Sequence, residues 1–278
     1  MYTEPIRRVS LSMKTLDDLR TEQQAEVQHY QAIADGVVRD HLKPQVGVIG
    51  VLLAGSVARG DARHGPFGLY VDLVVVVERR QDLDLVTTFG PSIEPFVPKH
   101  CVKIADTGIA LELTTKKDLQ DIRSRWESEI YARQESEILY DKTGFLSKWK
   151  SDAFKITDQQ LKNRALGWFF RCQYLVGDYR VEKWKHRSAW IQMCQIGNEA
   201  AECYCSFLYC INRQFIPRKD WLAYLTENLN DKAPEHKILL EEIYTSTPTE
   251  KSVDRRFGQL NKVLNWMEEY CRERTWIG

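Results

Sequence analysis

Hydrophobic residues change their spacing about halfway along this chain of 278 residues. In the first half, two short runs, 46–54 and 72–78, are almost continuously apolar, which is typical of strands buried on both faces. The segments 101–105 and 109–115 are also strand-like, and the turn-forming group 106–108 between them favours a hairpin. This part of the chain therefore predicts a small sheet.

Helical spacing precedes and follows these strands. Apolar residues recur every three or four positions over 16–42, which predicts a helix, and Pro44 ends it. A charged helix is predicted over 116–133 and a last strand over 138–141, and after Leu146 the valine-rich runs disappear. The helices predicted beyond that point cover 161–179, 184–212, 221–229, 236–244 and 255–272.

These patterns predict an α+β fold, with an N-terminal mixed sheet and its helices followed by a C-terminal helical bundle. The length of the chain agrees, because a domain usually has roughly 100–200 residues. We therefore expect two domains, 1–148 and 149–278. No apolar run is long enough to span a membrane, and residues 1–14 lack the apolar core of a secretory signal, so we expect a cytoplasmic protein without a membrane partner.

Charge and cysteine content narrow the function classes. Lys plus Arg equal Asp plus Glu at 39 each, so nothing in the net charge attracts a long nucleic acid, and a small substrate is favoured. The seven cysteines are an odd number without regular spacing, as in reduced intracellular proteins. Four of them cluster without a paired CxxC or a histidine, and we expect them in the core: Cys194, Cys203, Cys205 and Cys210.

The most distinctive chemistry lies where the first strand meets Gly55 and Ser56. A strand that turns sharply into a short helix leaves backbone N–H groups unpaired, and these groups together with the Ser56 hydroxyl suit phosphate oxygens. The next strand carries a single carboxylate, Asp72, among valines. A buried carboxylate is costly unless it is paired or coordinates a metal.

A second carboxylate, Glu112, lies on the strand 109–115. If the odd-numbered residues of that strand face the core, Glu112 points to the opposite face, where Asp72 must also lie if the two share a site. Two such carboxylates offer the hard oxygen ligands that Mg²⁺ prefers. The alternative, a solvated strand residue at 112, is equally open from sequence alone.

The residues from Val51 to Asp61, together with 70–78, resemble the DNA polymerase beta-like nucleotidyltransferase superfamily, most closely its small bacterial aminoglycoside and lincosamide members. The resemblance implies that the Gly-Ser turn holds a nucleoside triphosphate and that an Asp-x-Asp pair on the next strand binds two magnesium ions. This chain departs from the pattern, because Tyr70 stands where the first Asp is expected and the insert 64–69 lengthens the connection.

Three hypotheses follow. The first is a magnesium-dependent enzyme that transfers a nucleoside monophosphate from a triphosphate to a hydroxyl of a small molecule. The resemblance then assigns catalysis and metal binding to Asp72 and Glu112. Nucleotide contacts are assigned to the turn, to the short helix that follows it and to a basic cluster around position 185. The nucleotide-binding residues of this hypothesis are Gly55, Ser56, Arg59, Lys185 and Arg187.

The second hypothesis is a catalytically impaired relative that binds a nucleotide or a partner protein. This hypothesis rests on Tyr70, because a phenol is a poor magnesium ligand compared with a carboxylate. Asp61 could compensate for the lost carboxylate or lie at the surface. The third hypothesis is an interaction module of the toxin–antitoxin kind, which the fusion of both parts in one chain disfavours; homodimerisation is left open.

Overall fold

The computed structural model describes residues 16–64, 68–104, 106–245 and 247–278. The chain has the α+β class expected from its sequence. It divides into two compact units, one built from 1–121 and 135–150 and the other from 122–134 and 151–278. The segment 122–134 thus belongs with the second unit, whereas the predicted boundary at 148/149 placed it with the first.

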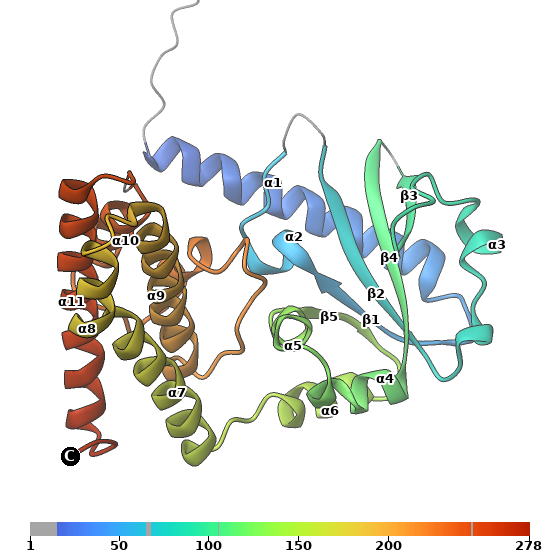
Figure 1. Cartoon of the computed structure of the whole chain (residues 1–278). Helices are drawn as coiled ribbons and strands as arrows, with labels where there is room; N and C mark the ends of the chain where they lie inside the picture. Colours follow the sequence, from blue (N-terminus) through green and yellow to red (C-terminus); the bar gives the residue numbers. More distant parts are fainter. Residues whose placement is uncertain (1–15, 65–67, 105, 246) are drawn as a thin grey trace, which may run out of the picture. The chain divides into compact units, whose positions relative to one another are not determined.

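The first unit is built on a five-stranded sheet (Figure 1). Its strand order is β3-β4-β2-β1-β5, and only the β2–β4 pairing is parallel. The strands are β1 (Val48–Ala54), β2 (Tyr70–Val77), β3 (His100–Ile104), β4 (Thr107–Thr115) and β5 (Glu137–Asp141). All five strands predicted from the hydrophobic pattern are present, and β3 and β4 are antiparallel neighbours as the hairpin prediction requires.

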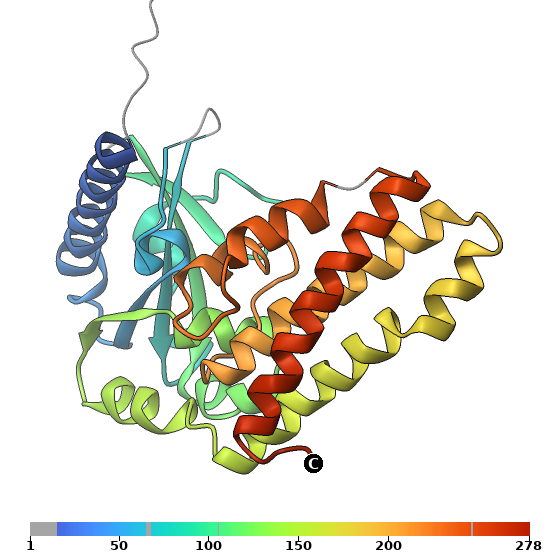
Figure 2. The ribbon, with the colours of Figure 1, turned by 90° about the vertical axis from the view of Figure 1, so that its left-hand side faces the viewer.

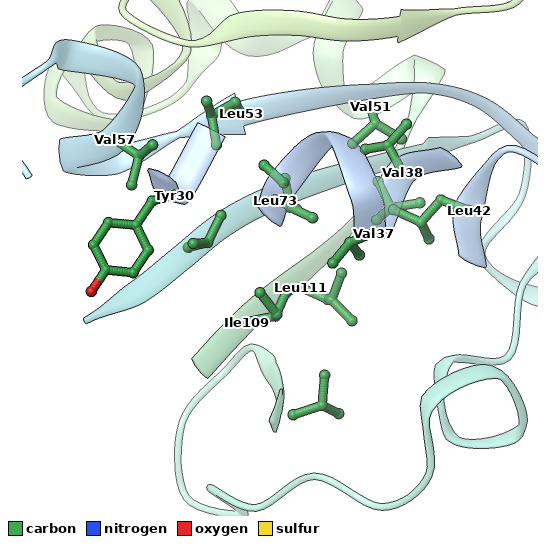
Figure 3. Close-up of a cluster of buried hydrophobic side chains, with 14 of the residues drawn as sticks. Tyr30, Val37, Val38, Leu42, Val51, Leu53, Val57, Leu73, Ile109 and Leu111 are labelled. Atoms are coloured by element: carbon green, nitrogen blue, oxygen red, sulfur yellow. The ribbon is translucent and has the colours of Figure 1, made fainter. Parts of the chain in front are cut away.

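One face of this sheet is covered by the first helix. Helix α1 (Leu16–Val37) continues as one π-helical turn (Val38–Leu42), and Figure 3 shows its apolar side chains facing those of the strands. Leu73 and Leu111 on the strands are almost completely buried in this cluster. The odd-numbered residues of β4 therefore face the core, as predicted, and the even-numbered ones face the other side.

The opposite face carries both apolar and polar side chains. Helix α6 (Phe145–Ala153) packs there, and a side chain at Gly50 would overlap Leu146 of that helix. The Trp149 indole N–H donates a hydrogen bond of 2.7 Å to the carbonyl oxygen of Leu119, which ties α6 to α4 (Lys116–Gln120). The same face also carries the carboxylates of Asp72 and Glu112.

Short helices complete the first unit: α2 (Gly55–Arg59), a 3-10 turn (Arg80–Asp82) and α3 (Leu85–Phe89). The prediction of a single helix over 116–133 is wrong. The segment is broken into α4, a 3-10 turn (Ile122–Ser124) and α5 (Glu127–Gln134), because its apolar residues pack in different units. Leu119 is buried in the first unit, whereas Tyr131 stacks edge-on against Tyr209 of the second.

The second unit is helical, as expected. Its helices are α5, α7 (Asp158–Val176), α8 (Asp178–Lys185), α9 (Trp190–Ile211), α10 (His236–Tyr244) and α11 (Glu250–Glu273). Figure 2 shows α7, α9 and α11 running beside one another. Two predictions fail: the helix over 184–212 is two helices interrupted near Ser188, whose φ is +50°, and the helix over 221–229 is only a 3-10 turn (Tyr224–Asn228).

Within the described residues, no helix combines the length and the apolar character that crossing a membrane requires. Of the four clustered cysteines, Cys203, Cys205 and Cys210 are buried in α9, as predicted for small core residues, and Cys194 is half-buried.

Candidate functional site

The candidate site begins where β1 turns into α2. Gly55 has φ +68°, a left-handed conformation that side chains other than hydrogen rarely tolerate. A Cβ at this position would also overlap the Oδ2 atom of Asp72. The turn therefore passes directly over that carboxylate, and only glycine allows the approach. Ser56 follows half-buried in α2.

Asp72 itself is held by a lysine. Its backbone pairs with Ala54 at the end of β1, which places its side chain beside the Gly55 turn. The Lys99 ammonium group lies 2.6 Å from Asp72 Oδ1, an ion pair between two partly exposed side chains. Asp72 was predicted to need either a charged partner or a metal ion, and in the structure its partner is the Lys99 side chain.

Tyr70 has a partner from the same segment as Lys99. Its hydroxyl donates a hydrogen bond of 3.1 Å to Glu94 Oε1. Burial raises the pKa of this phenol, and the neighbouring Glu94 raises it further, so the hydroxyl stays protonated at neutral pH. The ring lies over Gly108 of β4, where a Cβ would come within 2.8 Å of the ring carbons.

The segment that supplies these partners is anchored to the sheet just before β3. Ile93 N donates to the carbonyl oxygen of Cys101 at 2.8 Å, and Cys101 N donates to Ser92 Oγ at 3.0 Å. Lys99 and Glu94 were not singled out from the sequence. The available signal was indirect: a lone Asp in an apolar strand demands a partner, but no local spacing indicates that residue 99 provides it.

Glu112 lies on the same face as Asp72 but not beside it. In the parallel β2–β4 register, Ala110 is opposite Asp72, and Glu112 is opposite Val74. Two residues along a strand correspond to roughly 6–7 Å, so the two carboxylates are diagonal neighbours. Glu112 is half-buried.

The donor set at this corner does not fit a pair of magnesium ions. Tyr70 offers a phenol where the sequence resemblance leads one to expect a carboxylate. Ala110 lies opposite Asp72 on the neighbouring strand, and the Lys99 ammonium group is already bound to Asp72. Among the residues that the structure describes, no three His, Cys, Asp or Glu side chains gather as metal ligands would. Hard divalent cations require several oxygen donors around one point.

Further charges surround α2. Arg59 and Asp61 form an ion pair of 3.2 Å, and both side chains are largely buried, so Asp61 is not the exposed helix-end residue that was the alternative to a role beside Asp72. Burial raises the pKa of the Glu135 carboxyl, although Lys150 and Arg59 act in the opposite direction. Glu135 lies two residues before β5, and its partly buried carboxyl is a second feature of this part of the first unit that sequence reasoning missed.

The basic residues assigned to the nucleotide from the helical part belong to the second unit. Lys185 lies 2.7 Å from Asp254 Oδ1, and this hydrogen bond raises the pKa of its ammonium group. Arg187 Nη1 donates to the carbonyl oxygen of Lys183 at 2.6 Å. Both side chains thus have partners within their own unit, and their nucleotide contacts stay predictions. Of the predicted insert, 65–67 lie outside the described residues, and His64 is joined to Tyr30 of α1 by a 2.8 Å hydrogen bond.

Comparisons with known proteins give distant likenesses to solved structures alone. No protein-family model matches the chain, and no curated protein sequence matches it significantly. The chain is similar to a nucleotidyltransferase-like protein from Exiguobacterium sibiricum 255-15, with 14% identity and a TM-score of 0.41, over 85% of this chain and 74% of the other. This likeness is too distant to carry a functional inference.

Proposed function

We propose that the first unit binds a nucleoside triphosphate at the corner formed by Gly55, Ser56 and Asp72, with Lys99 supplying the positive charge that faces the phosphates. The protein would then be a nucleotide-binding relative of the nucleotidyltransferases. The observation that carries this proposal is the 2.6 Å ion pair between Lys99 and Asp72, at the place where the related enzymes are expected to hold metal.

An ammonium group can serve this role because it has three donors, of which Asp72 takes one. In this proposal the backbone N–H groups of the tight turn at Gly55 and the Ser56 hydroxyl would contribute further donors. Phosphate oxygens are strong acceptors for such charge-assisted hydrogen bonds. Because the counter-charge is a side chain, we expect binding without a divalent cation.

The second candidate is the magnesium-dependent transfer of a nucleoside monophosphate to a small-molecule hydroxyl. It is favoured by the common face of Asp72 and Glu112, the two carboxylates to which the sequence assigned the chemistry. For this candidate, Lys99 would have to leave Asp72. The residues present do not fit two magnesium ions, so this activity ranks second.

Calorimetry decides whether Lys99 binds the nucleotide. We expect a non-hydrolysable ATP analogue to bind the parent protein equally well in EDTA and in Mg²⁺, and Lys99→Ala to weaken binding by about tenfold or more, the loss typical of a charge-assisted contact. Lys103→Ala is the matched control, because Lys103 lies on β3 and pairs with Asp106 instead.

The outcomes separate the candidates. Strict dependence on Mg²⁺, with pyrophosphate released when an acceptor is added, would replace the proposal with the transferase. If neither ATP nor GTP analogues bind the parent under either condition, the corner has no nucleotide role. An equal loss in both lysine variants would mean that the effect is one of general charge and not of the contact with Asp72.

A further inference from the structure

The second unit contains a cavity of about 620 Å³ that none of the three sequence hypotheses uses. It is lined by the start of α5, by one face each of α7 and α9, and by the segment 216–222. Its volume lies in the range of sites for small organic ligands, roughly 300–1,000 Å³. All of its lining residues belong to the second unit.

Two indole side chains shape the cavity. Trp126, just before α5, is 80% exposed at the cavity wall, and Trp168 lines it from α7. Ile216 and the buried Leu222 add apolar surface. No aromatic ring of the described residues is recorded against the Trp126 indole, so its flat face is open to the cavity. Such a surface suits an aromatic ligand.

Charges in the cavity occur as opposite pairs. Arg171 lies 3.4 Å from Glu199, and Lys219 lies 2.8 Å from Glu202. The remaining lining carboxylate, Glu127, is bound by Arg164. A ligand with a large net charge would leave one of these charges unbalanced, whereas a ligand with one ammonium and one carboxylate can match both members of a pair.

We infer that this cavity binds a small zwitterionic aromatic molecule, that is, an aromatic amino acid or a short peptide of such residues. Its carboxylate would face Arg171, its ammonium would face Glu199, and its ring would lie against Trp126 and Trp168. Helix α9 supports this arrangement, because Glu199, Glu202 and Ser206 recur at helical spacing and line one wall.

The test uses the full chain and four forms of one probe. The dipeptide phenylalanyl-phenylalanine is compared by calorimetry with its N-acetyl form, its C-terminal amide and the form blocked at both ends. We expect the zwitterion to bind at least about tenfold more tightly than the doubly blocked form, with both singly blocked forms in between. Trp126→Ala and Arg171→Ala should each weaken zwitterion binding by about tenfold, which corresponds to one strong contact.

Tyr179→Ala is the control, because Tyr179 is 85% exposed on α8 and does not line the cavity. It should leave binding unchanged, and circular dichroism should show that all three variants keep their helices. The inference fails if none of the four forms binds, if all four bind equally, or if Trp126→Ala and Arg171→Ala bind the zwitterion as the parent does. It also fails if the singly charged amide binds best, since the cavity would then select a cation.

Discussion

The two faces of the sheet use the same strand in different ways. Leu73 and Val75 of β2 point to the face that α1 covers and are fully buried in a purely apolar cluster. On the other face, Val74 is buried too, but Asp72 forms an ion pair with Lys99. The comparison shows that the valine run of β2 stabilises the fold by burying side chains on both faces of the sheet. Only at Asp72, near the start of the strand, does β2 carry a charged side chain on one face.

The apolar face should be the more sensitive of the two to loss of volume. Leu73→Ala should lower the free energy of unfolding by about 2–5 kcal/mol, because it removes buried apolar contacts and leaves a cavity in the core. Denaturant unfolding measures the change. Val46→Ala, at a position 88% exposed just before β1, should change stability by less than about 0.5 kcal/mol. A cost for Leu73→Ala no larger than that of its control would contradict the assigned core.

The polar corner should respond to a single methyl group at the turn. Gly55→Ala should cost about 1–3 kcal/mol, since the new Cβ meets both a left-handed backbone and the Asp72 carboxylate. Gly60→Ala carries the backbone effect alone, because Gly60 has φ +78° with no atom within 4 Å of the added Cβ, so the difference between the two costs measures the contact with Asp72. Chemical unfolding of both variants compares them. Equal costs would show that Asp72 does not lie under the Gly55 turn.

The smallest effect concerns pH near the same corner. Burial raises the pKa of Glu135, so its contribution to stability is fully present below its unfolded pKa of about 4.5 and is lost as pH rises through the folded value. Glu135→Gln should therefore raise the melting temperature relative to the parent at pH 7 and lose this advantage at pH 4. Glu137→Gln, at an exposed position on β5, should show no such pH trend. A melting-temperature difference independent of pH would contradict this account.

The predictable part of the fold is the part that local patterns determine. The five strands and α10 were found from hydrophobic spacing, and α10 begins and ends at the predicted residues, 236 and 244. The helix predicted over 116–133 failed because periodicity does not say with which unit each turn of a helix packs. Likewise, the spacing over 184–212 could not reveal the left-handed backbone at Ser188 that separates α8 from α9.

For the candidate site, sequence identified positions but not partners. The Gly55 turn and the common face of Asp72 and Glu112 followed from residue type and strand alternation. The ion pair of Asp72 joins residues 27 positions apart and depends on how the segment before β3 folds back over the sheet. Contacts of that kind are determined by tertiary packing, so no local pattern could have indicated Lys99.

The allocation of 122–134 to the second unit has a consequence for how the protein is made and dissected. The chain crosses between the units at 121/122, 134/135 and 150/151, so neither unit is a single continuous length of polypeptide. During synthesis, α5 emerges before the helices on which it packs, and it must wait for α7 and α9 before Tyr131 can meet Tyr209. A gene fragment that starts after residue 150 would encode the second unit without its helix α5. On the ribosome, the strands of the sheet would all be synthesised before the helices of the second unit that follow residue 150.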